Sequence, residues 1–155
     1  MNKLNRRKFL ALAGVSSAAV TTGGAISLVK LGQTQGETLA FRAVAGLPSR
    51  LLPAYASYVI EGHVNLASRS GVVTQTLYAG APEGMSKIAF PGQSRIVRIT
   101  DAQDLGGTFR ILGTFDDRSQ LQHGESSTFD ILLNPSQRIA RTNFFGSELV
   151  LQLEG

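Results

Sequence analysis

The chain has 155 residues and a mass of 16.5 kDa, and its 43% of hydrophobic and 17% of charged residues are typical of a packed domain rather than of a disordered chain. It contains no cysteine, which excludes disulfides, thiol nucleophiles, iron–sulfur clusters and cysteine-based zinc sites. The net charge of +4 resides in residues 1–40, because residues 41–155 hold ten basic and ten acidic side chains, and this balance predicts no nucleic-acid partner.

The first predicted element is an N-terminal export signal, carried by the run Asn5-Arg6-Arg7-Lys8-Phe9-Leu10. Two consecutive arginines precede a variable residue, a phenylalanine and a leucine, and the residues that match this motif are Arg6, Arg7, Phe9 and Leu10. A weakly apolar stretch follows over residues 9–29, and a basic residue, Lys30, comes directly after it. The segment resembles a twin-arginine (Tat) signal peptide. The resemblance implies passage through the Tat translocase to the periplasm, or to the thylakoid lumen in a phototroph.

Two fates of this signal helix are open. Small residues at both ends of Thr38-Leu39-Ala40 favour cleavage after Ala40. A leader that is not cleaved would instead act as an anchor, because the 21 residues from Phe9 to Val29 are just long enough to span a bilayer. The predicted organisation is a signal peptide and linker in residues 1–40, followed by one exported β-domain in residues 41–155.

Residues 41–155 alternate apolar and polar side chains with a period of two, which is typical of antiparallel strands with one buried face. The clearest alternation covers residues 57–66, 109–115, 128–133 and 148–154. Weaker candidates are residues 72–79, 87–90, 94–100 and 138–144, and residues 41–45 are expected to pair as an edge strand.

Turn-forming residues separate these runs and define the fold class. They are Gly80–Gly84, Pro91-Gly92, Asp104–Gly107, Asp116-Asp117, His123-Gly124 and Asn134-Pro135. About seven to nine short strands at this spacing predict an all-β domain, either a single antiparallel β-sandwich or a small β-barrel. Leu47 to Ala54, which contains two prolines, is expected to be irregular.

Metal-ligating side chains are few. Glu61 and His63 emerge side by side from one strand, and His123 would add a third ligand if the fold brought it close. Two histidines in the whole chain make a poor inventory for zinc or copper, so these residues are weak candidates. Asp101 and Asp104 lack the spacing of a calcium loop, and acids beside glycines usually form turns. We therefore expect no metal and no other cofactor.

The run His123-Gly124-Glu125-Ser126-Ser127 contains a histidine, an acid and two serines. It lacks the glycine on each side of a serine that a nucleophile elbow requires, and neighbours in sequence rarely adopt triad geometry. We expect a polar hairpin connection here and no catalytic residue.

Residues 41–155 contain nine arginines but only one lysine. Arg95, Arg98 and Arg110 lie on predicted strands and form a candidate binding face for a carboxylate-bearing partner. The alternative interpretation, which the sequence favours, is a set of ion pairs across the sheet.

These observations favour an exported, non-catalytic β-domain that acts as a binding or assembly accessory module for another exported or membrane-associated protein. The alternative is a small barrel with an interior pocket, which carries an apolar ligand or catalyses a cyclase- or isomerase-type reaction. Polar side chains that point into the barrel would favour this alternative, and Arg98, Tyr58 and Tyr78 are the candidates.

Overall fold

The computed structural model describes residues 38–48, 55–87 and 89–155. The predicted signal helix, with Arg6, Arg7, Phe9 and Leu10, lies outside the described residues, as does most of the predicted irregular segment before Ala54. In the part of the chain that is described, no helix has the length and apolar character needed to cross a membrane.

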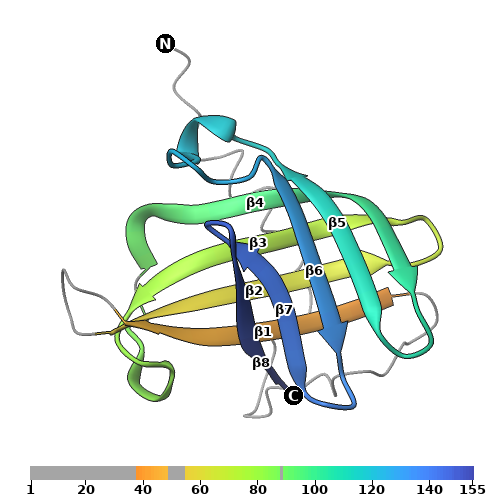
Figure 1. Cartoon of the computed structure of the whole chain (residues 1–155), viewed down its shortest axis with the longest axis horizontal. Coiled ribbons are helices and arrows are strands. Elements are labelled where there is room, and N and C mark those ends of the chain that lie inside the picture. Colours follow the sequence, from red (N-terminus) through yellow and green to blue (C-terminus); the bar gives the residue numbers. More distant parts are fainter. Residues whose placement is uncertain (1–37, 49–54, 88) are drawn as a thin grey trace, which may run out of the picture.

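Eight antiparallel strands follow one another around a closed barrel, so that each strand pairs with its neighbours in sequence and the last pairs with the first (Figure 1). The strands are β1 Thr38–Pro48, β2 Tyr55–Asn65, β3 Ser70–Ala79, β4 Ala89–Asp104, β5 Phe109–Phe115, β6 Thr128–Asn134, β7 Ile139–Phe144 and β8 Ser147–Glu154. Two short 3₁₀ turns, η1 Pro82–Gly84 and η2 Arg118–Gln120, lie in the connections β3–β4 and β5–β6. The predicted all-β fold is confirmed, and of its two forms the chain adopts the barrel.

The first strand is not an edge strand, contrary to the sequence-based prediction. β1 pairs with β2 from Thr38↔Asn65 to Pro48↔Tyr55, and with β8 from Arg42↔Glu154 to Val44↔Gln152. It begins three residues before the predicted domain boundary and includes Leu47 and Pro48, because these two residues pair with Ala56 and Tyr55 of β2. Leu39 is 2% exposed in the core, so a cut after Ala40 would remove a core side chain.

The two short strands predicted at residues 87–90 and 94–100 are one long strand, β4. Pro91-Gly92 therefore does not form a turn; it lies in an irregular part of the ladder, between the pairs Tyr78↔Ala89 and Thr76↔Ser94. A proline and a glycine are tolerated in a strand at such a bulge, because the ladder needs no amide hydrogen bond there. A second bulge, at the pairs Ile99↔Gly113 and Asp101↔Leu112, carries β4 on to Asp104.

The turn after β4 forms as the acidic residues and glycines predict. The Oδ1 atom of Asp104 accepts hydrogen bonds from the backbone N–H groups of Gly106 at 2.9 Å and Gly107 at 2.8 Å. Both glycines have positive φ. Asp104 thus stabilises its own turn, as the acid-beside-glycine pattern predicts.

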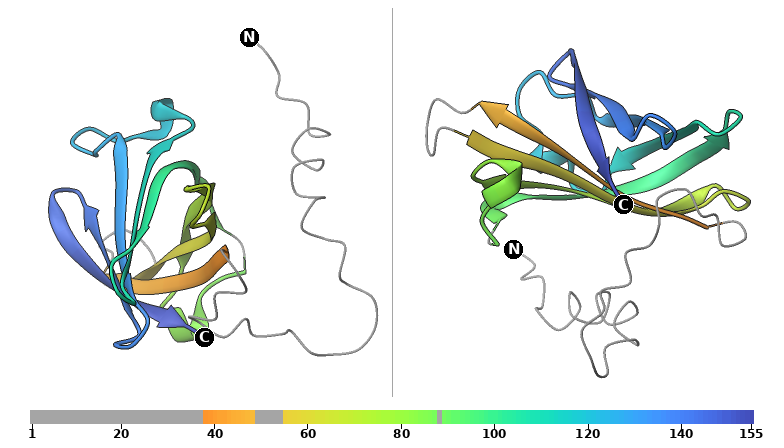
Figure 2. Two further views of the ribbon diagram at one scale, coloured as in Figure 1. Left: turned by 90° about the vertical axis from the view of Figure 1, so that its right-hand side faces the viewer. Right: turned by 90° about the horizontal axis from the view of Figure 1, so that it is seen from below.

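The two ends of the barrel differ in what fills them. The end that carries the β2–β3, β4–β5 and β6–β7 turns, here called the core end, is packed with aliphatic side chains. From the middle of the barrel to this end, the following side chains are each at most 1% exposed: Ile60, Val64, Ile111, Ile131, Leu133 and Leu151. The opposite end, here called the mouth, carries η1, the long β5–β6 connection with η2, and the β7–β8 turn (Figure 2). The candidate site lies in the mouth.

Candidate binding site at the open end of the barrel

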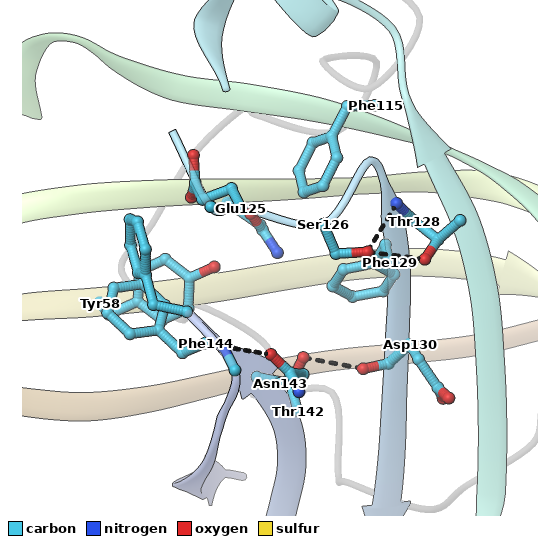
Figure 3. A pocket seen from close by; sticks show the side chains of 14 residues that line it. Tyr58, Phe115, Glu125, Ser126, Thr128, Phe129, Asp130, Thr142, Asn143 and Phe144 are labelled. Carbon is cyan, nitrogen blue, oxygen red and sulfur yellow. Dashed lines mark hydrogen bonds between the residues drawn. The ribbon is translucent and has the colours of Figure 1, made fainter. Parts of the chain in front are cut away.

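A cavity of about 510 Å³ opens in the mouth, between strands β2, β3, β5, β6 and β7. Five aromatic side chains line it: Tyr58, Phe115, Phe129, Phe144 and Phe145. In Figure 3, Tyr58 and Phe144 lie on one side of the cavity and Phe115 and Phe129 on the other. Polar groups are added by Gln75, Glu125 and Thr142. The cavity is therefore an aromatic space with a few polar groups.

The cavity exists because β6 and β7 separate towards the mouth. Their register extends from Asn134↔Ile139 to Ile131↔Thr142, and beyond this point the two strands diverge (Figure 1). At the start of the gap, the Thr142 hydroxyl donates a hydrogen bond of 2.8 Å to the backbone carbonyl of Asp130. The cavity is lined from both sides of the gap, by residues 128–130 and 142–146. The cavity therefore lies against the part of the barrel wall where β6 and β7 are no longer paired.

The aromatic residues of the β7–β8 turn pack against one another, and one of them has an unfavourable backbone conformation. Phe144 packs against Tyr58, with ring centroids 5.1 Å apart, and against Phe145 at 4.8 Å in an edge-to-face arrangement. Phe145 and Gly146 have φ of 51° and 78°, the left-handed pair that a two-residue hairpin turn requires. A phenylalanine rarely adopts this conformation, and such backbone strain is concentrated at functional sites. The turn keeps a ring at the cavity rim where glycine or asparagine would be easier to accommodate.

A buried ion pair crosses the mouth. The Arg95 Nη1 and Glu125 Oε1 atoms are 2.6 Å apart, and the two side chains are only 11% and 12% exposed. The other Glu125 oxygen, Oε2, accepts a hydrogen bond of 2.6 Å from the backbone N–H of Gln122. Arg95 points into the barrel because it shares the parity of Val97 and Ile99, which are both buried. The pair borders a second cavity of about 210 Å³. The residues that line both cavities are Tyr58, Gln75, Glu125, Phe144 and Phe145.

The environment of Tyr58 keeps its hydroxyl protonated. Burial raises the pKa of Tyr58 well above its usual range; the charge of Arg95 lowers the pKa in part, and that of Glu125 raises it further. The neutral hydroxyl both donates and accepts hydrogen bonds, and its oxygen points into the cavity (Figure 3). Tyr58 therefore offers a ligand a ring face and a hydrogen-bonding group.

This pKa shift predicts a loss of stability at alkaline pH. The unfolded chain ionises tyrosine near pH 10, whereas folded Tyr58 keeps its proton to higher pH. Above about pH 10 the unfolded state binds fewer protons, so the free energy of unfolding falls as pH rises, by at most about 1.4 kcal/mol per pH unit from this group. Urea unfolding between pH 8 and pH 11 should give a shallower decline for Tyr58→Phe than for the wild type. Equal slopes would contradict the prediction; Tyr55→Phe, at a ring that is 50% exposed, controls for the loss of a tyrosine.

The three arginines predicted to form one binding face do not share a face. Arg95 lies inside the mouth, whereas the Arg98 and Arg110 side chains are 73% and 49% exposed on the outer surface. The inward orientation predicted for Arg98 is wrong, because the buried parity of β4 is that of Val97, and Ile96 is 39% exposed beside Arg98. Of the other inward candidates, Tyr58 does line the cavity, while Tyr78 lines neither of the two mouth cavities.

Ion pairs within the barrel engage many of the arginines. Arg110 pairs with Asp130 at 2.7 Å and Arg141 with Glu148 at 2.9 Å, each reaching a diagonal position on the adjacent strand. Further pairs are Arg42 with Glu61 and Glu154, Arg69 with Asp101, and Arg98 with Asp116. The interpretation of the arginine excess as ion pairs across the sheet is therefore confirmed for Arg42, Arg110 and Arg141, whose partners lie on adjacent strands.

The structure does not bring the weak metal candidates together. Glu61 and His63 lie on the outer face of β2 towards the core end, where Glu61 accepts a hydrogen bond from Arg42. His123 is exposed in the β5–β6 connection, at the mouth. Within the described ranges, no three histidine, aspartate or glutamate side chains are arranged to hold a metal ion. At the end of this connection, the hydroxyl of Ser126 lies 2.8 Å from that of Thr128, the first residue of β6, as expected of a polar hairpin.

Comparison of the chain with protein-family models, with curated proteins and with solved structures finds no match. The interpretation of the site therefore depends on its own geometry. Sequence reasoning placed Tyr58 inside the barrel and named Arg95 as a candidate binding residue, but on a face shared with Arg98 and Arg110. It missed the inward position of Arg95, the role of Glu125 and the four phenylalanines. One signal was present: Arg95 shares its parity with two apolar residues of the same strand, Val97 and Ile99.

Proposed function

We propose that this barrel is a binding protein that holds a small aromatic ligand in its mouth. One observation carries the proposal: aromatic side chains enclose a cavity of about 510 Å³ at one end of a barrel whose other end is packed with aliphatic side chains. Ligand cavities in proteins are commonly of this size, apolar, and equipped with a few oriented polar groups. The β7–β8 turn, which keeps the Phe145 ring at the rim, supports the same function.

The cavity suits binding better than catalysis. None of the described residues that line the two mouth cavities is a histidine, lysine or cysteine. The two acids there are engaged, Glu125 by Arg95 and Asp130 by Arg110, and Tyr58 keeps its proton. An enzyme would need a free base or nucleophile positioned at the ligand.

The twin-arginine motif at Arg6, Arg7, Phe9 and Leu10 supports a site of action outside the cytoplasm. We propose that the Tat translocase exports the barrel to the periplasm or thylakoid lumen, with the leader as a membrane tether if it is not cleaved. Export of a folded chain agrees with a domain that contains no cysteine and whose core is formed without disulfides.

A second candidate function is capture of an exported or membrane-associated protein by the outer surface. It is favoured by Val72 on β3 and Ile96 on β4, which are 49% and 39% exposed on neighbouring strands. A folded barrel that fails to bind small aromatic probes would favour this candidate over the first.

A neutral fluorescent probe tests the proposed function. Phenylnaphthylamine should bind the purified full chain at one saturable site with increased fluorescence. Phe144→Ala should weaken binding about tenfold, since it removes a ring that contacts Tyr58 and lines the cavity. Leu105→Ala, at a leucine that is 55% exposed at the core end, should leave the dissociation constant unchanged. Folded protein without saturable binding would refute the proposal, as would equal dissociation constants for the two variants.

A further inference from the structure

Arg95 places a fixed positive charge beside the aromatic side chains that line the mouth. Its backbone lies in the middle of the sheet, paired with Gln75 on β3, and its neighbours of the same parity, Val97 and Ile99, are buried in the core. The side chain cannot leave the mouth without disrupting β4. A buried guanidinium requires a carboxylate or another acceptor, because an unpaired charge in such surroundings is strongly unfavourable.

Glu125, which supplies that carboxylate, is attached differently. It belongs to the β5–β6 connection, residues 116–127, and not to a strand. Two contacts hold its carboxylate, the ion pair with Arg95 and the hydrogen bond from the Gln122 amide within the same connection. Glu125 is one of the residues that line both the cavity of about 510 Å³ and that of about 210 Å³. Outward movement of the connection would uncover Arg95.

We propose that Glu125 occupies a carboxylate site that belongs to the ligand, and that the ligand is an aromatic carboxylate. On binding, the ligand carboxylate takes over the Arg95 guanidinium, the ring system lies among Tyr58, Phe129 and Phe144, and Glu125 moves out into water with its connection. This inference rests on the proposed function and adds to it the charge of the ligand. It also makes the β5–β6 connection a latch that is closed in the empty barrel.

The exchange is balanced in charge. Arg95 remains paired throughout, because one carboxylate replaces another, and the planar guanidinium can donate two parallel hydrogen bonds to the incoming carboxylate. Glu125 regains hydration when it leaves the mouth, since it is 12% exposed in the closed state. A neutral ligand of the same shape gains nothing from Arg95 and leaves the latch closed. The latch therefore gives the site selectivity for anions at the expense of part of their affinity.

If the Arg95–Glu125 ion pair had only a structural role, we would expect different results. If the pair only holds the connection in place, removal of the Glu125 charge lowers stability and changes the affinities for charged and neutral ligands alike. If Glu125 competes with the ligand, its removal strengthens the binding of carboxylates alone. Two ligands of nearly identical shape, naphthoate and naphthamide, separate these cases.

The experiment measures displacement of phenylnaphthylamine by naphthoate and by naphthamide from the full chain. Glu125→Gln should bind naphthoate about tenfold more tightly than the wild type, and naphthamide with unchanged affinity. Arg95→Gln should lose about tenfold in naphthoate affinity and retain naphthamide. Glu148→Gln removes an exposed carboxylate that is paired with Arg141, and should change neither affinity.

The outcomes distinguish this inference from the proposed function. If neither compound displaces the probe, or if the probe itself does not bind, the proposed function fails. If naphthamide binds while Glu125→Gln leaves naphthoate affinity unchanged or shifts both affinities equally, only the latch is refuted. Should Arg95→Gln not fold, Arg95→Lys keeps the charge but loses the planar fork, and the Glu125→Gln result remains decisive.

Discussion

Arg95→Met is expected to lower the free energy of unfolding of the barrel by about 3 kcal/mol, because it leaves the Glu125 carboxylate without its cation. Both side chains are largely buried, at 11% and 12% exposure, so water screens the pair little. Breaking a fully buried pair costs about 3 to 5 kcal/mol. We expect the lower end of that range because Glu125 lies in a connection and regains water by moving outwards. Urea unfolding followed by circular dichroism measures the loss.

Arg110→Met is the matched control. Arg110 lies on the adjacent strand, β5, and pairs with Asp130 at 2.7 Å, but the two side chains are 49% and 44% exposed. We expect a much smaller loss than for Arg95→Met, because water already solvates both charges of an exposed pair. Adding Glu125→Leu to Arg95→Met should recover part of the stability, since the orphaned charge is removed. Equal losses for Arg95→Met and Arg110→Met would contradict the burial argument.

The sequence predicted the strands well because alternation is a local property. The runs that became β2, β5, β6 and β8 carry apolar residues at every second position, and each buries that parity. Barrel closure was not predictable, because it depends on the short register between Arg42↔Glu154 and Val44↔Gln152, at opposite ends of the domain. No local pattern in β1 or β8 distinguishes a strand that closes a barrel from one at the edge of a sandwich.

The site was harder to predict, for two physical reasons. Ile96 and Val97 are adjacent apolar residues, so the sequence left the buried parity of β4 ambiguous, and Arg98 was assigned the inward position that Arg95 holds. The cavity itself depends on the divergence of β6 and β7 beyond Ile131↔Thr142, which is a property of strand lengths and register. Tyr58 was predictable as an inward residue because it shares its parity with Ile60 and Val64, which are both buried.

The second substitution that we expect to destabilise the barrel strongly lies opposite the second bulge of β4. Gly113 on β5 lies opposite this bulge, paired with Ile99. A Cβ atom at Gly113 would come within 2.5 Å of the Val97 Cγ1 atom and 2.7 Å of the backbone carbonyl oxygen of Arg98. The second contact is with backbone in the centre of a sheet, which cannot move aside as a flexible side chain would. Gly113→Ala must therefore push β4 and β5 apart.

We expect Gly113→Ala to cost about 3 kcal/mol in the free energy of unfolding, at the upper end of the range for overpacked cores. Gly84→Ala in η1 is the matched control, because no atom lies within 4 Å of the added Cβ. It should be neutral or slightly stabilising, since alanine restricts the unfolded chain more than glycine does. Val97 and Arg98, which the added Cβ atom would meet, lie two and three residues from Arg95 on β4, so Gly113→Ala should also weaken phenylnaphthylamine binding in protein that remains folded. A Gly113→Ala variant as stable as Gly84→Ala would show that β4 and β5 yield at the bulge.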